Sequence, residues 1–430
     1  MTDMYELTMV QAALADGTAD TDSVFELFAR RLPAGRRYGV VAGTGRMLEA
    51  LAAFRFGDDE LAVVADLVDT RTADWLADYR FSGEIDGYRE GELYFPGSPV
   101  LTVRGGFAEC VLLETLVLSI YNHDSAIASA AARMASAAGD RPMIEMGSRR
   151  THEEAAVAAA RAAYLAGFTA TSNLEAARRY AVPPTGTSAH AFTLLYTGAG
   201  GPDEAGAFRA QVAALGTGTT LLVDTYDTTA GVAAAVKVAG SGLGAVRIDS
   251  GDLGVMAQMV RAQLDGLGNT DTKIVVSGDL DEYALAALAA APVDAYGVGT
   301  SLVTGSGAPT AGMVYKLVEV DGIPVAKRAT DKASRGGAKT AVRWHRPTGT
   351  AVAEVVHPAG ADAPPAPEGL TARRLAVPLV RGGQAVGDAD PAAALTAARD
   401  RVAAGLRSLP WEGLRLTAGD PALPVQFVDP

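Results

Sequence analysis

Apolar and polar residues follow two different patterns in the first third of the chain. Helical spacing occurs at 44–54 and 58–69, whereas residues 83–105 alternate as strands do. This mixture predicts a small N-terminal α+β domain over residues 1–105. The following segment, Phe107 to Ala138, is rich in Ala and Leu at helical spacing and predicts one long helix.

Beyond residue 140 the pattern becomes repetitive. Short apolar runs, each followed by polar or glycine residues and then a helical stretch, begin at Met143, Gly167, Ala191, Thr219, Ala245, Lys273 and Val293. Repeated strand, loop and helix units predict parallel strands with right-handed crossovers. Because nearly every run ends in polar residues, the pattern favours an α/β barrel over an open doubly wound sheet, which gathers its ligand at one switch point. The barrel domain is predicted over residues 106–320.

The last part of the chain, residues 321–430, is too short for a large independent domain. It begins with a hairpin-like segment, VEVDGIPVAKRAT, and contains a helical pattern from about Pro391 to Leu406. We expect this segment to pack against the N-terminal domain. The predicted class is therefore α/β, with an irregular barrel and a second α+β domain formed by both ends of the chain.

Charge and composition limit the classes of partner. The 430 residues include 37 basic and 50 acidic side chains, a net charge of −13, which opposes binding to nucleic acid or an anionic membrane. No apolar stretch is long enough to span a membrane, and Asp3 and Glu6 stand where a signal peptide carries basic residues. Cys110 is the single cysteine, so neither an internal disulfide nor a cysteine-rich zinc site is expected. These features indicate a cytoplasmic protein.

Lysine is concentrated in one region. Of six lysines, Lys316, Lys327, Lys332 and Lys339 fall within 24 positions, interleaved with arginine and glycine. A local positive charge beside a flexible loop suits a polyphosphate ligand, which lysine binds as a point charge. The alternative is a solvated basic loop, although the scarcity of lysine elsewhere favours function.

Two consecutive apolar runs end in small residues. Gly278 and Asp279 follow one run, and Gly299 and Thr300 follow the next. Small residues at late barrel strands let backbone N–H groups and a helix N-terminus approach a phosphate. Ordinary turns with Asp or Ser capping a helix would show the same residues.

Arg247 and Asp249 lie two positions apart in AVRIDSGDLG. Along an extended strand they point to the same side, so a cation and a carboxylate would face one ligand. The arginine could cover an aromatic ring or meet a carboxylate, and the aspartate could bind a ribose hydroxyl or a magnesium-bound ligand. A structural salt bridge is the alternative.

His190 stands in GTSAHAF, between a polar turn and an apolar run that predicts a strand. A lone histidine is more often structural, but a neutral imidazole in a phosphate-binding loop can accept a phosphoryl group. Asp224 and Asp227, in LVDTYDTTAG, resemble the diphosphate-sugar motif of type I phosphoribosyltransferases imperfectly, because the two acids are not adjacent. Helix capping by Asp227 is the alternative.

Ten motifs occur together in an order and spacing that resemble the nicotinate phosphoribosyltransferase family, from residue 3 to about 345. They are TDMYELTM, FELFARRLP, EMGSRRTHE, TATSNLEAARRY, GTSAHAF, LVDTYDT, VRIDSGDL, VVSGDLDE, YGVGTSLVT and VYKLVEVDG. The resemblance implies an irregular α/β barrel of the type II phosphoribosyltransferases and a homodimer with active sites at the interface.

The resemblance also implies a reaction. Nicotinate and 5-phosphoribosyl 1-diphosphate would give nicotinate mononucleotide and pyrophosphate, a step of NAD biosynthesis, with Mg²⁺ as cofactor and ATP as co-substrate. ATP would phosphorylate a histidine transiently, and by motif position this is His190. The other implied site residues are Arg247 over the pyridine ring, Asp249 near the ribose and ring, Gly278, Asp279, Gly299 and Thr300 around the 5-phosphate, Arg149 on a phosphate, Lys316 and Lys327 on the diphosphate, and Tyr5 across the dimer interface.

Two positions bear on the choice of substrate. Met146 stands where the related nicotinamide-using enzymes have a stacking Phe, and Ser172 stands near their amide-binding Asp. Like charges at 4 Å cost about 4 kcal/mol at an effective dielectric near 20, so a neutral residue there suits the carboxylate of nicotinate. Two alternatives remain: a nicotinamide or other pyridine phosphoribosyltransferase on the same scaffold, and a non-catalytic phosphate-ligand sensor.

Overall fold

The computed structural model describes residues 1–327, 334–387 and 390–428. It divides into two compact units, one of residues 1–129 with 308–430 and the other of residues 130–307. No helix within those three ranges is both long and apolar enough to cross a membrane. Lys332, one of the grouped lysines, lies outside the described residues.

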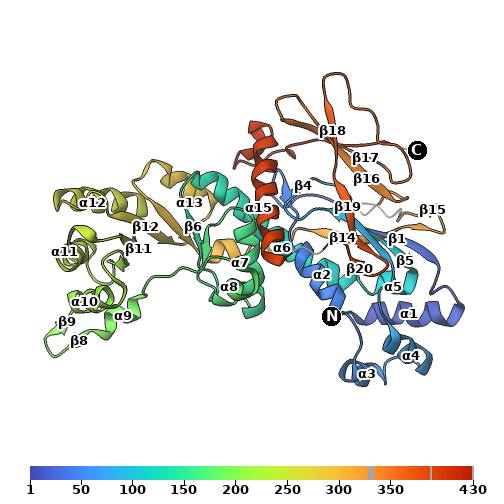
Figure 1. Cartoon of the computed structure of the whole chain (residues 1–430), viewed down its shortest axis with the longest axis horizontal. Helices are drawn as coiled ribbons and strands as arrows, with labels where there is room; N and C mark the ends of the chain where they lie inside the picture. The colour runs from blue at the N-terminus through green and yellow to red at the C-terminus, as the bar shows by residue number, and fades with distance from the viewer. Residues whose placement is uncertain (328–333, 388–389, 429–430) are drawn as a thin grey trace. The chain divides into compact units, whose positions relative to one another are not determined.

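The first unit is built on two mainly antiparallel sheets (Figure 1). The larger sheet has the order β15 (Ile323–Pro324), β14 (Met313–Val320), β1 (Asp22–Ala29), β5 (Leu101–Gly106), β3 (Glu84–Tyr88), β19 (Ala376–Arg381) and β20 (Gln384–Ala385). The smaller has the order β18 (Thr371–Arg374), β16 (Lys339–His345), β17 (Ala351–Pro358) and β21 (Val425–Phe427). Three N-terminal strands, β1, β5 and β3, lie together in the larger sheet, with β15 and β14 on one side and β19 and β20 on the other, so strands from both ends of the chain share one sheet.

Helices complete this unit. They are α1 (Met4–Asp16), α2 (Thr44–Ala53), α3 (Asp58–Val64), α4 (Thr70–Asp78), α5 (Phe107–Val111), the first half of α6 (Glu114–Ala138), and α15 (Pro391–Ser408). The predicted helices at 44–54 and 391–406 are confirmed. The single helix predicted from Phe107 is wrong in one respect, because the chain turns at Leu112 and Leu113 between α5 and α6. Both leucines are buried, so apolar spacing alone does not reveal the break.

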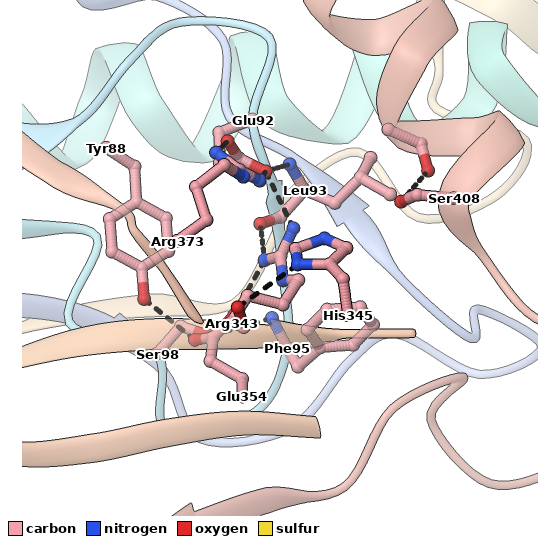
Figure 2. Close-up of polar contacts among 11 residues, drawn as sticks. Tyr88, Glu92, Leu93, Phe95, Ser98, Arg343, His345, Glu354, Arg373 and Ser408 are labelled. Carbon is pink, nitrogen blue, oxygen red and sulfur yellow. Dashed lines mark hydrogen bonds and ion pairs between the residues drawn. The ribbon is translucent and has the colours of Figure 1, made fainter. Parts of the chain in front are cut away.

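A buried ion network joins the two sheets of the first unit (Figure 2). Arg343 of β16, with its side chain 1% exposed, donates to Glu92 and to Glu354 of β17, both at 2.7 Å. Tyr88 of β3 donates to Glu354 at 2.7 Å, and Arg373 of β18 also binds Glu92. Although burial acts to raise the pKa of Glu92, the two arginines hold it below its ordinary value. The network therefore keeps paired charges inside the unit.

The second unit contains a parallel sheet with the order β10 (Thr220–Leu222), β11 (Ala245–Ile248), β12 (Lys273–Gly278), β13 (Ala295–Val298), β6 (Met143–Glu145) and β7 (Ala170–Thr171). The helices that follow the strands are α7 (Glu153–Leu165), α8 (Leu174–Tyr180), α9 (His190–Leu195), α10 (Glu204–Leu215), α11 (Thr228–Ala239), α12 (Leu253–Gly266), α13 (Glu282–Ala287) and α14 (Thr300–Val303). The α/β class with parallel strands is confirmed. Closure into a barrel is not: in the described part of the chain, β10 and β7 are the edges of the hydrogen-bonded sheet.

One predicted strand is wrong. The run from Ala191 forms the short helix α9, which begins at His190. Leu194 and Leu195 are 52% and 73% exposed, so this run is not a buried strand. Its apolar residues resemble those of the sheet strands in type, but they have no neighbouring strand to pack against in the described sheet.

Candidate active site

Most of the predicted site residues line one cavity in the second unit. The cavity has a volume of about 220 Å³ and lies at the carboxyl ends of β6, β11, β12 and β13. Its lining includes Met146, Arg149, Arg150, Arg247, Asp249, Ser277, Gly278, Asp279, Gly297, Gly299 and Thr300. Ligands of open α/β sheets bind in the same place, outside the carboxyl ends of the strands.

Glycine allows the close packing around this cavity. Gly278 has a φ of +138°, and a Cβ built there would lie 3.3 Å from the Asp249 carbonyl oxygen. A Cβ on Gly297 would lie 2.7 Å from the Met146 Sδ, so the methionine packs over that glycine. The absence of side chains at these positions lets a small ligand approach the backbone closely.

Replacing Gly278 with Ala should lower the free energy of unfolding by about 1 to 3 kcal/mol, because the alanine Cβ disfavours that backbone conformation. Gly266→Ala is the matched control, since Gly266 lies at the end of α12 with nothing within 4 Å of an added Cβ. Thermal unfolding followed by circular dichroism would measure both. Equal melting temperatures for the two variants would contradict the expectation.

Arg247 is held in place by its neighbours. Its guanidinium donates to the Thr187 hydroxyl and, at 3.3 Å, to the Ser188 carbonyl oxygen. The carboxylate of Asp249 lies 3.7 Å away, which confirms that the two side chains face the same side. Burial lowers the pKa of Arg247, against the opposing effect of Asp249. The arginine is therefore fixed and only 8% exposed, at the wall of the cavity.

His190 lies beside two aspartates. Its Nδ1 is 3.1 Å from the Thr225 hydroxyl, and its Nε2 is 3.9 Å from both Asp224 Oδ1 and Asp249 Oδ2. The side chain is 38% exposed, which leaves the imidazole open to a reactant. Because Asp249 also lines the cavity, it joins the histidine to the residues around the glycines.

Asp224 is a site residue whose place the sequence did not predict. Its Oδ2 accepts from the Asp249 backbone N–H at 2.8 Å and from the Ser250 hydroxyl at 2.7 Å. These two hydrogen bonds fix the Asp224 carboxylate, which is 2% exposed, beside His190. The sequence feature that could have indicated this site residue is the position of Asp224 directly after an apolar strand. Asp227, by contrast, caps α11 by accepting from the Ala230 N–H at 2.8 Å, as the structural alternative predicted.

Five predicted residues do not line the cavity, and the first of them, His190, lies beside Asp249 of its wall. Ser172 follows β7, is exposed, and donates its backbone N–H to the Glu145 carbonyl oxygen. Tyr5, Lys316 and Lys327 belong to the first unit. There Lys316 Nζ lies 3.4 Å from Glu114, and burial, followed by the charge of Glu114, raises the pKa of the Tyr5 phenol. Tyr5 and Lys316 thus lie near one carboxylate, whereas Lys327 is exposed and its backbone N–H donates to the Ser334 hydroxyl at 3.2 Å.

A metal site made by the protein alone is not found among the described residues, where no three His, Cys, Asp or Glu side chains converge suitably. Mg²⁺ usually keeps several waters and binds one or two carboxylates together with substrate phosphates. The acidic residues near the cavity therefore suit a metal ion that arrives with a phosphorylated ligand rather than one held permanently.

Comparison with known proteins places the chain in a family. Residues 1–122 match the model of the nicotinate phosphoribosyltransferase (NAPRTase) N-terminal domain, and residues 142–345 match that of the NAPRTase family. The chain belongs to the nicotinate phosphoribosyltransferase family. The resemblance seen in the ten motifs is thereby confirmed.

Individual family members match over long stretches. Nicotinate phosphoribosyltransferase pncB1 of Mycobacterium tuberculosis is 66% identical, covering 100% of this chain and 95% of the relative. The Bacillus subtilis nicotinate phosphoribosyltransferase is 39% identical over 74% of this chain and 66% of its own length. The crystal structure of human nicotinic acid phosphoribosyltransferase superposes with a TM-score of 0.84 at 27% identity, covering 99% of this chain and 97% of that one. The fold class is therefore that of the family.

Proposed function

We propose that the protein transfers the phosphoribosyl group of 5-phosphoribosyl 1-diphosphate to nicotinate, giving nicotinate mononucleotide and pyrophosphate for NAD biosynthesis. The observation that carries the proposal is the convergence of Arg247, Asp249, Gly278 and Asp279 on one cavity beside His190. Relatives that match the whole chain carry the name of this activity. We further propose a homodimer in the cytoplasm with active sites at the interface, where Tyr5 would reach across to the partner, and we assign Lys316 and Lys327 to the diphosphate.

This reaction requires stabilisation of charge and does not require removal of a proton. The pyridine nitrogen of nicotinate attacks C1 of the ribose with its own lone pair, and the C1–O bond to the diphosphate breaks with its electrons leaving on oxygen. Positive charge develops on the ribose, and Asp249 is the carboxylate proposed to stabilise it. Mg²⁺, when bound with the substrate, would help to neutralise the departing diphosphate.

Each remaining residue receives a role from its place. Backbone N–H groups near Gly278, Asp279, Gly299 and Thr300 suit the 5-phosphate, because α14 begins at Thr300. Arg149 provides a cation at the same cavity, and Met146 packs beside Gly297 where the pyridine ring would lie. Ser172 is proposed as the neutral residue near the nicotinate carboxylate. Ser172 is exposed after β7, so we expect it to contact the carboxylate once nicotinate is bound.

ATP is proposed as a co-substrate that phosphorylates His190. A phosphoryl group on Nε2 would lie near Asp224 and Asp249, both 3.9 Å from that nitrogen. The Thr225 hydroxyl at Nδ1 orients the ring so that Nε2 is the nitrogen presented. Linked sites are typically coupled by 1 to 3 kcal/mol, so phosphorylation would change the affinity for 5-phosphoribosyl 1-diphosphate by about 5- to 150-fold.

Replacing His190 with Ala should abolish nicotinate-dependent ATP hydrolysis, because no other imidazole lies at this position. Release of inorganic phosphate would measure the loss, and acid-labile phosphate on the protein would report the intermediate directly. His152→Ala is the matched control, since His152 is an exposed residue that caps α7. Normal ATP hydrolysis by the His190 variant would remove this part of the proposal.

A further inference from the structure

The carboxyl group of Glu204 lies within the influence of Asp224, whose carboxylate is 3.9 Å from His190 Nε2, and it has no defined role. Glu204 is the first residue of α10, which Asp203 caps by accepting from the Gly206 N–H at 2.8 Å. The helix cap therefore does not need Glu204. Its Oε1 is buried and has no hydrogen-bond partner among the described residues. A buried carboxylate oxygen without a partner is costly, so its presence here calls for a physical reason.

Packing around Gly231 places this carboxyl group beside the loop that carries Asp224. A Cβ built on Gly231 of α11 would overlap the Val223 carbonyl oxygen and would lie 3.3 Å from Glu204 Oε2. Val223 immediately precedes Asp224, whose Oδ1 is likewise buried and unpartnered within the described chain. That same oxygen lies 3.9 Å from His190 Nε2. One carboxylate oxygen of Glu204 and one of Asp224 thus lack a hydrogen-bond partner among the described residues, and the Asp224 oxygen lies beside the histidine.

The surrounding charges make the Glu204 proton hard to lose. Burial, followed by the carboxylates of Asp224 and Asp227, raises the pKa of Glu204 to about 7. From the elements packed against it, α9 contributes His190, the loop after β10 contributes Asp224, and α11 contributes Asp227 at its N-terminus. Glu204 therefore changes charge close to neutral pH.

The basic side chains of these helices are directed elsewhere. Lys237 lies in the last turn of α11, at the other end of that helix from Asp227. On α10 itself, the exposed Arg209 is 3.3 Å from Asp203. The two charged groups that act most on Glu204 are both carboxylates. Ionisation of Glu204 thus adds negative charge to a region that is already negative.

We propose that Glu204 is a positioning residue for phosphorylation of His190, acting through Asp224. When Glu204 is protonated it is neutral, and Asp224 is then the nearest buried negative charge on that side of the imidazole. When Glu204 ionises, a second negative charge there disfavours the incoming phosphoryl group of ATP, which is itself anionic. This inference rests on the proposed phosphohistidine. It adds that acceptance of the phosphoryl group depends on the proton of one particular carboxyl group.

The test compares phosphoenzyme formation across pH in three proteins. Wild-type protein is mixed with ATP labelled at the γ-phosphate, and acid-labile label is counted between pH 6 and pH 9. We expect the wild-type rate to fall by about tenfold on the alkaline side, the effect of a coupling of one pKa unit. Glu204→Gln, which has the same shape without the charge, should lose this fall. Glu154→Gln, the same change in the exposed first turn of α7, should behave as wild type.

Two further measurements keep the outcomes distinct. Glu204→Asp retains the charge and should restore the alkaline fall, which a merely structural role would not predict.

Thermal unfolding tests the charge of Glu204 without ATP. The raised pKa of Glu204 in the folded state means that its stabilising contribution is present below about pH 4.5 and is lost as pH rises through about 7. The melting temperature of Glu204→Gln should therefore gain on that of wild type between pH 5 and pH 8.

The results separate the two proposals. A wild type that takes up no label at any pH overturns the phosphohistidine and, with it, the role of Glu204. Labelling of wild type combined with an identical pH profile for Glu204→Gln overturns only the role of Glu204.

Discussion

Replacing Arg343 with Met should lower the free energy of unfolding of the first unit by about 3 to 5 kcal/mol, the cost of leaving buried charges without their partner. Arg343 binds Glu92 and Glu354, whose side chains are 3% and 0% exposed. Methionine fills a similar volume but neutralises neither carboxylate. Glu92 would keep Arg373, whereas Glu354 would keep, from the described part of the chain, the hydroxyl donors Tyr88 and Ser98.

Arg373→Met is the control for this substitution. Arg373 also binds Glu92 at 2.7 Å, but its side chain is 49% exposed, so we expect a loss of about 1 kcal/mol or less. The three tryptophans, Trp75, Trp344 and Trp411, all belong to the first unit, so their fluorescence in urea reports its unfolding. Equal losses for the two variants would show that burial does not govern the strength of this network.

Replacing Arg247 with Ala should reduce the kcat for nicotinate by about 10²-fold, as expected when a fixed group that holds the pyridine ring in its reacting orientation is removed. Thr187 and Ser188 hold the guanidinium in one orientation at the cavity wall. Arg247→Lys should recover little activity, because an ammonium group cannot reproduce the planar fork of arginine.

Pyrophosphate release under saturating 5-phosphoribosyl 1-diphosphate would measure the effect of both Arg247 variants. Arg178→Ala is the matched control, since Arg178 is a 69% exposed residue of α8 in the same unit, paired with Glu175. Its activity should remain near that of wild type. A kcat for Arg247→Ala within a factor of three of wild type would contradict the role given to Arg247.

The parallel sheet could be predicted from the sequence because its strands are short, apolar and regularly spaced. The segments at Met143, Thr219, Ala245, Lys273 and Val293 contain β6, β10, β11, β12 and β13. The segment at Ala191 failed because composition alone does not tell a buried strand from a short exposed helix. Barrel closure also could not be predicted, since it depends on how the edge strands meet and not on the strands themselves.

Part of the site was predictable for the same reason. Residues at the ends of neighbouring parallel strands must lie at one edge of the sheet, so Arg247, Asp249 and Gly278 could be grouped from their positions. The contacts of His190 with Thr225 and Asp224 could not, because they depend on the path of loops between elements. Arg343 shows the same limit in the core. From the sequence alone, an arginine in a strand is expected to be exposed to solvent. The fold is needed to show that Glu92 and Glu354 bind Arg343 in the interior of the unit.

The most direct measurement is the formation of nicotinate mononucleotide from nicotinate and 5-phosphoribosyl 1-diphosphate by the purified protein, followed by chromatography with and without ATP. We expect one pyrophosphate per mononucleotide, a faster reaction when ATP is present, and much weaker use of nicotinamide or quinolinate. A folded protein that forms no mononucleotide from nicotinate, or that prefers nicotinamide, would contradict it.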